Sequence, residues 1–468
     1  MRLLVNDTYK CLPVVHRRKD RKLSAMRGAY LIRFLIPLVV TAGFFSSAHG
    51  QDSLIYKPLT LEDTYKLALT NSYQLKISKN NVDQGHQQIE ISKLSRLPSI
   101  GTNLEYGYIS NAETWNPSFG DHQTIAVPHH FTSFETQASE VVFKGGEIQN
   151  QIKKSGFQEQ IATLYNEKSI QDIKLLVSAK YLDIYRLISQ QRIYDNNIRL
   201  TKNRLKNVLV MQKQGMVTQN DVLRTELTIS EFVLALRRTT NDILILNKQL
   251  NVVTGLSDSV LLIPDSTLLH NTRMKKPLPE YLTEATKNNQ DLRISAVNSQ
   301  IAETNIKLLG SDRYPQIFLY AGSSLGRPYT YSVPAIDIYT NVWQAGIGIH
   351  YNISSTYQTR KKIKSGEIAL TQSRERQILE KQNLEVGVKA AYIKYNEASE
   401  DLETLTSDLK SAEENYRVVE KKYLNQLALL TDMIDATNTK VEAELKVTTA
   451  RINVVYTYCR LLYTVGTL

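Results

Sequence analysis

The chain of 468 residues contains one unit twice, and this duplication limits its possible folds more than any other feature. Four segments of the first half match segments of the second half. The pairs are 67–78 with 284–295, 96–98 with 313–315, 179–181 with 390–392, and 220–223 with 431–434. The first two pairs are 217 positions apart and the last two are 211 positions apart. A change of offset between landmarks indicates an indel in a loop of a duplicated fold.

Each half begins with a predicted helix that ends before a proline. Residues 60–95 and 279–311 have helical patterns, and Pro98 and Pro315 follow them. Proline forces its predecessor towards extended geometry, so a strand is expected next. The sequence therefore predicts a β-hairpin at 98–143 and its repeat at 315–353.

Alternation of apolar and polar residues supports these strands. It is clear after Pro98 and at residues 343–353, where one face carries Trp343, Ala345, Ile347, Ile349, Tyr351 and Ile353. Residues 131–143 and 315–326 alternate less well and are predicted as strands mainly from the repeat. Proline-containing loops are expected at 109–130 and 327–338.

Very long helices are expected after the hairpins, at 146–213 and 357–424. About 68 residues at ~1.5 Å each reach ~100 Å, more than a globular domain of this size can hold. Return helices at 219–253 and 430–463 carry apolar residues at alternating steps of three and four, which is typical of coiled coils. An ordinary helical bundle explains the stripes alone, but not the helix lengths with the embedded strands.

The division that follows has four parts. They are residues 1–50, an upstream extension with a signal peptide at 26–50; 51–254, the first repeat; 255–278, a linker; and 279–468, the second repeat. Residues 34–45 are the apolar stretch of the signal, and 48–50 have the pattern of a cleavage site. About 12 apolar residues span only ~18 Å, too short for a bilayer. The true start, Met1 or Met26, stays open.

Composition argues against several classes of function. The net charge of +11 falls to +4 once residues 1–50 are set aside, because they hold nine basic and two acidic residues, so no nucleic-acid partner is expected. Only Cys11 and Cys459 are present, so the mature chain cannot form an internal disulfide. No catalytic, cofactor or metal motif stands out, and an enzyme is not expected. The adjacent His129 and His130 are read as a solvated loop pair.

Four strands with one apolar and one polar face cannot close a barrel in lipid, because open edges leave backbone groups unsatisfied. Several copies must therefore share one barrel, and three copies give twelve strands. Tyr106, Tyr108 and Trp343 fall in the hairpins and are expected at the lipid–water boundary, with simple hydrophobic packing as the alternative. The sequence predicts an internally duplicated α+β membrane protein with a shared barrel and a coiled-coil helical tunnel.

This order of elements resembles the TolC family of outer-membrane efflux and secretion channels over residues 55–465. The resemblance implies a homotrimer with a twelve-strand barrel in the lipid outer membrane and a helical tunnel in the periplasm. It also implies a periplasmic adaptor and an inner-membrane pump of the RND, ABC or MFS type as partners. The expected function is an exit duct of a tripartite efflux pump or type I secretion system. The cargo stays open.

The resemblance also implies site residues. Residues 431–436 resemble the family segment whose two aspartates line the narrow entrance, here Asp432 and Asp435, on one helix face. Tyr423 and Arg451 match the tyrosine and arginine that hold the family's gate closed, and Asp221 matches their acidic partner. Gly215 and Gln426 lie at the expected adaptor-contact tips.

The second tip departs from the family pattern. Gln426 replaces the usual glycine, and Ala428 the usual basic residue, so the adaptor surface is expected to differ.

A secreted coiled-coil structural or adhesive protein is the main alternative function, but it leaves the duplicated hairpins unexplained. A soluble adaptor would need a single helical hairpin with a flanking β-domain.

Overall fold

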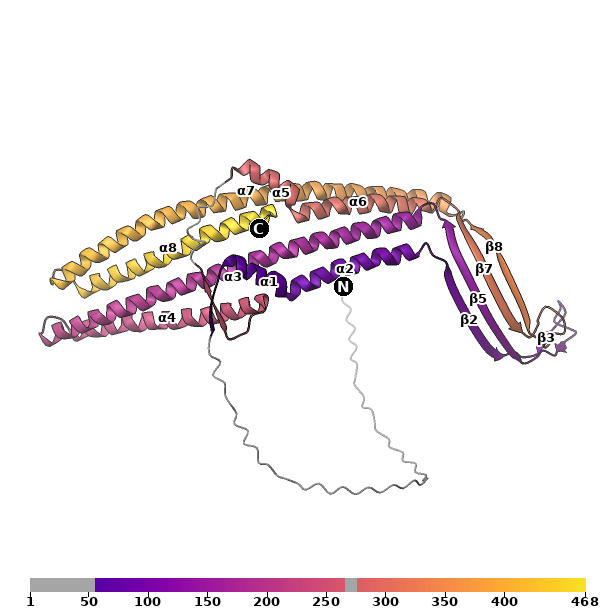
Figure 1. Ribbon diagram of the computed structural model, residues 1–468, viewed down its shortest axis with the longest axis horizontal. Coiled ribbons are helices and arrows are strands. Elements are labelled where there is room, and N and C mark those ends of the chain that lie inside the picture. The colour runs from indigo at the N-terminus through magenta and orange to yellow at the C-terminus, as the bar shows by residue number, and fades with distance from the viewer. Residues whose placement is uncertain (1–54, 266–275) are drawn as a thin grey trace, which may run out of the picture. The chain divides into compact units, whose positions relative to one another are not determined.

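The computed structural model describes residues 55–265 and 276–468. The expected signal peptide at 26–50 and the upstream extension lie outside this part of the chain. Residues 52–468 form one unit, in which the two repeats lie side by side (Figure 1). Each repeat contains two short helices, two long strands, a very long helix and a return helix.

The main elements follow the order expected from the duplication. In the first repeat they are α1 (Leu61–Asn71), α2 (Tyr73–Leu94), β2 (Ser99–Tyr108), β5 (His130–Phe143), α3 (Glu147–Lys213) and α4 (Gln219–Thr254). In the second they are α5 (Leu278–Asn288), α6 (Gln290–Ser311), β7 (Gln316–Arg327), β8 (Thr340–His350), α7 (Ser355–Leu424) and α8 (Leu430–Val465).

The long helices α3 and α7 contain 67 and 70 residues, which corresponds to about 100 Å each. The very long helices predicted after each hairpin are thereby confirmed. Neither helix contains a proline, so no backbone bond of the ladder is lost to one. Throughout residues 55–265 and 276–468, no helix is both long and apolar enough to cross a membrane.

The helices predicted at 60–95 and 279–311 are each broken once, so the prediction of one continuous helix was wrong in both repeats. The breaks lie at Ser72 and Asn289, where ψ is 122° and 123°. The Asn289 side chain accepts a hydrogen bond from the Leu292 backbone N–H at 3.1 Å, and its Nδ2 donates to the Thr464 carbonyl at 3.2 Å. Short polar side chains such as these compete with helical backbone bonds and favour caps.

The end of each return helix packs against a break. Gly255 and Gly466 follow α4 and α8 with φ of +71° and +86°. A Cβ on Gly255 would lie 2.7 Å from the Cβ of Asn71, and a Cβ on Gly466 would lie 2.8 Å from the carbonyl oxygen of Asn288. Glycine is required at both positions because it adopts this backbone conformation and leaves the space free.

The four long strands form one antiparallel sheet in the order β2-β5-β7-β8. The hairpins predicted in the two repeats are confirmed, including the two strands with weak alternation. The pair β5–β7 joins one repeat to the other. Among the described strands, none pairs with the outer edge of β2 or β8.

The register assigns each strand residue to one of two faces. The apolar face carries Leu104 and Phe134, opposite each other on β2 and β5, and Leu319 and Ile347, opposite each other on β7 and β8. The polar face carries, among others, Glu105, Glu135, Gln137, Gln344, Gly346 and Gly348. On the polar face, the rings of Tyr320 and Phe318 lie over Gly346 and Gly348, so this face is more aromatic than the sequence alternation indicates.

Two small sheets lie outside the strands that the sequence predicted. In the predicted loop 109–130, β3 (Ala112–Thr114) pairs with β4 (Gln123–Ile125). In the predicted linker, β6 (Val260–Pro264) pairs in parallel with β1 (Ile55–Leu59). The prediction of a loop without strands at 109–130 was wrong, because β3 and β4 are too short for a periodic signal.

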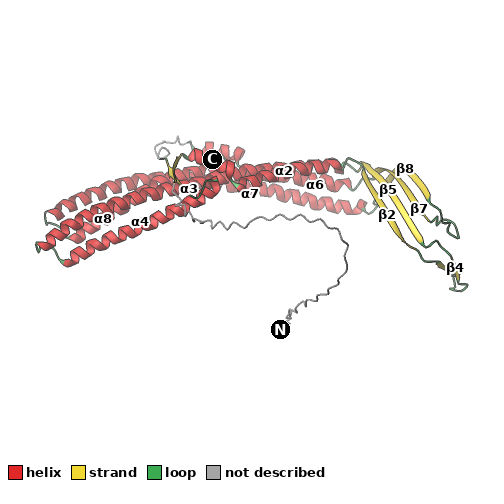
Figure 2. Ribbon diagram, turned by 60° about the horizontal axis from the view of Figure 1, so that its bottom comes forward, coloured by secondary structure: helices red, strands yellow, loops and turns green. Residues whose placement is uncertain are grey.

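Neighbouring helices change along the length of the unit. Next to the sheet, the order of contacting helices is α2-α3-α6-α7 (Figure 2). Towards the other end it is α4-α3-α8-α7. Buried apolar residues gather in separate clusters, most of them between adjacent helices; one is formed by Leu182 with Ile452 and Cys459. Helix α7 on one side, and α2 and α4 on the other, form the edges of this layer.

Candidate functional site

Two short turns connect the long helices to the return helices at the end away from the sheet (Figure 1). The first tip is residues 214–218 and the second tip is residues 425–429. Gly215 has φ of +72°, and Gln426, at the equivalent position, has φ of +63°. The repeat thus requires a left-handed residue at both tips, and the second tip places a glutamine there. The Gln426 Nε2 donates to Sδ of Met216 in the first tip at 3.5 Å.

Two aspartates from the sequence analysis cap the helices that follow the tips. The Asp221 carboxylate accepts hydrogen bonds from the backbone N–H and hydroxyl of Thr218, both at 2.8 Å. The Asp432 carboxylate accepts one from the Leu429 backbone N–H at 3.0 Å. Anions are favoured at helix N-termini by the unpaired N–H groups and the helix dipole. Asp432 and Asp435 are both exposed on the first two turns of α8.

An apolar cluster directly behind the tips joins all four long helices. Its buried residues are Val208, Val222, Tyr416, Tyr423, Leu430 and Met433. Tyr423 therefore belongs to the apolar packing behind the tips. Burial raises the pKa of Tyr423, partly opposed by the nearby Arg204 guanidinium. Within the described chain, the Tyr423 hydroxyl has no hydrogen-bond partner.

Arg204 is the principal residue near the tips that sequence reasoning missed. It lies on α3, is only 8% exposed, and donates to the Thr437 hydroxyl at 3.0 Å and to the Tyr416 hydroxyl at 3.3 Å. These bonds connect the first repeat to α8 and α7 of the second. A buried guanidinium held by neutral hydroxyls is costly to desolvate and strongly dependent on its hydrogen bonds.

Further charged groups surround this link. The Tyr416 hydroxyl donates to Glu420 at 2.9 Å, and the Lys440 ammonium lies 4.7 Å from the Tyr416 ring centroid. Lys440 also forms an ion pair with Glu444 at 3.6 Å, with both side chains less than one-fifth exposed. Burial raises the pKa of Glu444, and Lys440 counteracts this shift. Arg204, Lys440 and Glu444 thus form a partly buried polar layer next to the tip cluster, on its side towards the sheet.

Arg451 does not lie with these residues. It is exposed on α8, nineteen positions after Asp432, which corresponds to about 28 Å along the helix. Asp221 bonds within its own tip, so the expected pair of Arg451 and Asp221 is not formed within the described chain. Arg204 shares a buried line of α3 with Asn197, Thr201 and Val208, at steps of four, three and four, and this mostly polar line gives no apolar pattern in the sequence.

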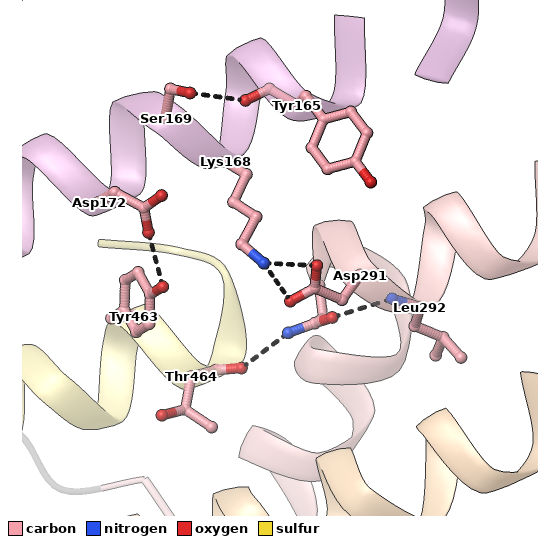
Figure 3. A network of polar contacts seen from close by, with 9 residues as sticks. Tyr165, Lys168, Ser169, Asp172, Asp291, Leu292, Tyr463 and Thr464 are labelled. Carbon is pink, nitrogen blue, oxygen red and sulfur yellow. Dashed lines mark hydrogen bonds and ion pairs between the residues drawn. The ribbon is translucent and has the colours of Figure 1, made fainter. Parts of the chain in front are cut away.

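A second polar network holds α3 against the second repeat at its helix break (Figure 3). The Lys168 ammonium donates to both oxygens of Asp291, at 2.6 and 2.8 Å. The Tyr463 hydroxyl donates to Asp172 at 2.6 Å. Burial, followed by the hydrogen bond to Asp172, raises the pKa of Tyr463. These contacts attach the middle of α3 to both α6 and the end of α8.

The aromatic residues expected at a lipid boundary are exposed on one face of the sheet. Tyr106, Tyr108 and Trp343 are 72, 68 and 78% exposed, and all three share the apolar face by register. Tyr106 stacks on His130 and Tyr108 on His129. The two histidines thus extend the aromatic surface. Among the residues that the structure describes, no group of three or more His, Cys, Asp or Glu could hold a metal ion.

Comparisons with known proteins agree with this architecture. Residues 281–467 match the family model for outer membrane efflux protein. The fold is similar to the outer membrane protein VceC from Vibrio cholerae, with a TM-score of 0.71 and 11% identity, covering 87% of this chain and 96% of that one. It is also similar to the Campylobacter jejuni CmeC outer membrane channel, with a TM-score of 0.68, 12% identity, and 87% and 85% coverage.

A third similar structure is the open state of the Neisseria gonorrhoeae MtrE outer membrane channel, with a TM-score of 0.67 and 14% identity. It covers 87% of this chain and 88% of that one. No curated protein matches the chain in sequence. The alternative of a secreted coiled-coil protein without a pore is not supported by these similarities.

Proposed function

We propose that the chain, whose residues 281–467 match the outer membrane efflux protein model, is a channel of the TolC family. We further propose that three copies assemble into one exit duct that receives cargo from a periplasmic adaptor and an inner-membrane pump. The outer-membrane location and the channel role are family properties. The proposal adds the trimer, the shared barrel, the partners and the gate residues, and it draws on this chain's own geometry for support.

The unsatisfied edges of the unit carry the proposal. The sheet ends at β2 on one side and β8 on the other, and the helix layer ends at α2 and α4 on one side and α7 on the other. In lipid, every unpaired strand group costs several kcal/mol, so β8 of one copy must pair with β2 of the next. Such head-to-tail contacts form a closed ring when the rotation between copies closes.

Exposed apolar residues follow the same edges of the helix layer. On α4 they are Leu223, Leu227, Leu234, Ile245 and Val252, and on α7 they include Ile368, Leu379, Val386 and Ile393. Steps of seven and eleven residues place most members of each set along one line of a helix. An apolar line on each edge is the surface that a second copy would cover, since single exposed apolar residues are common but aligned ones mark interfaces.

The faces of the sheet then have distinct environments. The apolar face, with Trp343 and Ile347, would contact lipid, and the polar face would line a wet lumen. The tips would lie in the periplasm and contact the adaptor. Asp432 and Asp435 would form two rings of three carboxylates at the entrance, and the Arg204 link would hold α7 and α8 against α3 in the closed state.

The assembly can be tested on the mature protein in outer membranes and detergent. We expect detergent-dependent extraction, a mass of three copies by native mass spectrometry, and stepwise conductance in planar bilayers. A water-soluble monomer of stable fold would contradict the proposal.

A pair of variants tests the apolar line on α7. Val386→Glu places a charge on this line, where the next copy would cover it, and should weaken the trimer. Its matched control is Glu385→Gln, which alters the charge at the neighbouring position off the line and should leave the trimer intact. An unchanged trimer mass in Val386→Glu would mean that this line is not covered by a second copy.

A further inference from the structure

A cavity of about 690 Å³ lies on the sheet near the end that carries the loops. Strands β5, β7 and β8 form its floor, and residues 328–331 of the loop after β7 form part of its wall. Most of its lining residues on the strands share the polar face by register. They include Phe131, Ser133, Glu135, Gln137, Ser324 and Gln344.

Aromatic rings contribute the apolar part of this lining. The Phe131 ring lies over Gly107 of the neighbouring strand, where a Cβ would approach its Cε1 to 2.3 Å. Gly107 therefore provides the space that this ring occupies. Tyr329 and Tyr331 line the wall, with ring centroids 5.6 Å apart, and the Tyr331 side chain is 90% exposed. The exposed Tyr331 ring is therefore accessible to a bound molecule.

The charge of the lining is negative. Glu135 lies on the floor, and the one basic residue of the described lining, Arg327, already donates two hydrogen bonds to Asp337, at 2.6 and 2.9 Å. The Arg327 guanidinium also stacks on Tyr339, 5.5 Å from the ring centroid. Its charge is thus neutralised within the loop, whereas the carboxylate of Glu135 lines the cavity beside the amides of Gln137 and Gln344.

We propose that this cavity binds an organic cation with a flat apolar or aromatic body, and that cargo of this class contacts it on leaving the duct. The inference rests on the proposed function, because the polar face must line the lumen. Aromatic rings attract cations through their π faces and carboxylates attract them by charge. The amides can accept or donate hydrogen bonds without favouring either sign.

Binding can be measured without ion flow. Ethidium is the probe, and its fluorescence polarisation is followed with the detergent-solubilised full assembly. We expect saturable binding that Glu135→Gln weakens about 5- to 10-fold, a loss typical of one partly solvated charge contact together with its π contacts. The matched control is Glu140→Gln, which removes a carboxylate from the same strand on the opposite face. Equal affinity in wild type and Glu135→Gln would overturn the proposal.

Two further variants test the contribution of the aromatic rings in the cavity lining. Tyr331→Ala alters an exposed side chain and should weaken ethidium binding about 3-fold without changing assembly. Phe131→Leu should weaken it by a similar factor. In planar bilayers, tetraphenylphosphonium should block the current at lower concentration than tetraethylammonium. If current flows and both cations block it at the same concentration, the cavity proposal alone is overturned. If no current flows at all, the proposed function is overturned.

Discussion

The guanidinium of Arg204 and the hydroxyl of Thr437 are joined by a 3.0 Å hydrogen bond across the two repeats, behind the tips. A hydrogen bond to a charged group typically contributes ~1.5–3 kcal/mol. Because the donor is on α3 and the acceptors are on α8 and α7, outward movement of the second helix pair would break the link and leave a charge buried.

We therefore expect Arg204→Leu to favour the open state. In the proposed trimer, loss of the link in three copies is sufficient to shift a two-state equilibrium measurably, so single-channel conductance or open probability in planar bilayers should rise. Arg451→Ser is the comparison variant, because Arg451 is exposed far from the tips. If Arg451→Ser opens the channel and Arg204→Leu does not, the controlling link lies between copies.

Substitutions of Asp432 and Asp435, the two aspartates proposed to line the entrance, should have different effects. Asp435→Asn should lower cation preference and weaken block by trivalent cations, with a change in stability under about 0.5 kcal/mol. Asp432→Asn should lower cation preference too, but it also loses a charged cap on the Leu429 N–H, worth about 0.5–1 kcal/mol. Reversal potentials in a salt gradient and thermal unfolding in detergent measure the two effects. Unchanged selectivity in both variants would mean that the entrance lies elsewhere.

Gln426→Gly should stabilise the protein. Gln426 has φ of +63°, and a residue with a Cβ pays about 1 kcal/mol for this conformation. The reciprocal variant Gly215→Ala should destabilise by a similar amount, since a Cβ there meets only open space and strain is its main effect. Denaturation midpoints of both variants give the comparison. Destabilisation by Gln426→Gly would show that the contact with Met216 outweighs the strain.

Much of the fold was accessible from the sequence because its signals are local and repeated. Pro98 and Pro315 end helices at equivalent places, and alternation of apolar and polar residues marks β8. The breaks at Ser72 and Asn289 were not predicted, because a helical pattern continues through both and the cap at Asn289 depends on Thr464, far along the chain.

The candidate site was harder to predict, because its main contacts join residues that lie far apart in the sequence. Asp221 and Asp432 were indicated by the family resemblance, and the structure gives both the same capping position. Arg204 has no counterpart motif, and its burial is decided by helices of the other repeat. Its neighbours on the same line of α3 include Asn197 and Thr201, so the sequence shows no apolar stripe there.

The glycines at the ends of the return helices should tolerate no side chain. Gly466→Ala places a Cβ 2.8 Å from the Asn288 carbonyl oxygen, a backbone atom that cannot rotate away, and adds strain at φ of +86°. We expect a loss of about 2–4 kcal/mol. Gly156→Ala is the control, because Gly156 is inside α3 and an added Cβ would meet no atom of a neighbouring element within 4 Å. This variant should gain about 0.5–1 kcal/mol of stability. Equal effects of the two variants would mean that the packing at the break is loose.

The last prediction concerns the two faces of β8. The variant Ile347→Cys should react with lipid-soluble maleimides, and Gln344→Cys with membrane-impermeant ones, because register places these positions on opposite faces. Positions 346 and 348 are unsuitable, since a Cβ there would lie 2.8 Å from the Tyr320 hydroxyl oxygen and 2.3 Å from Cζ of Phe318. The native Cys459 is only 1% exposed and should contribute little background. Reversed labelling would place the polar face against lipid, and it would remove the basis for both the lumen and the cation cavity.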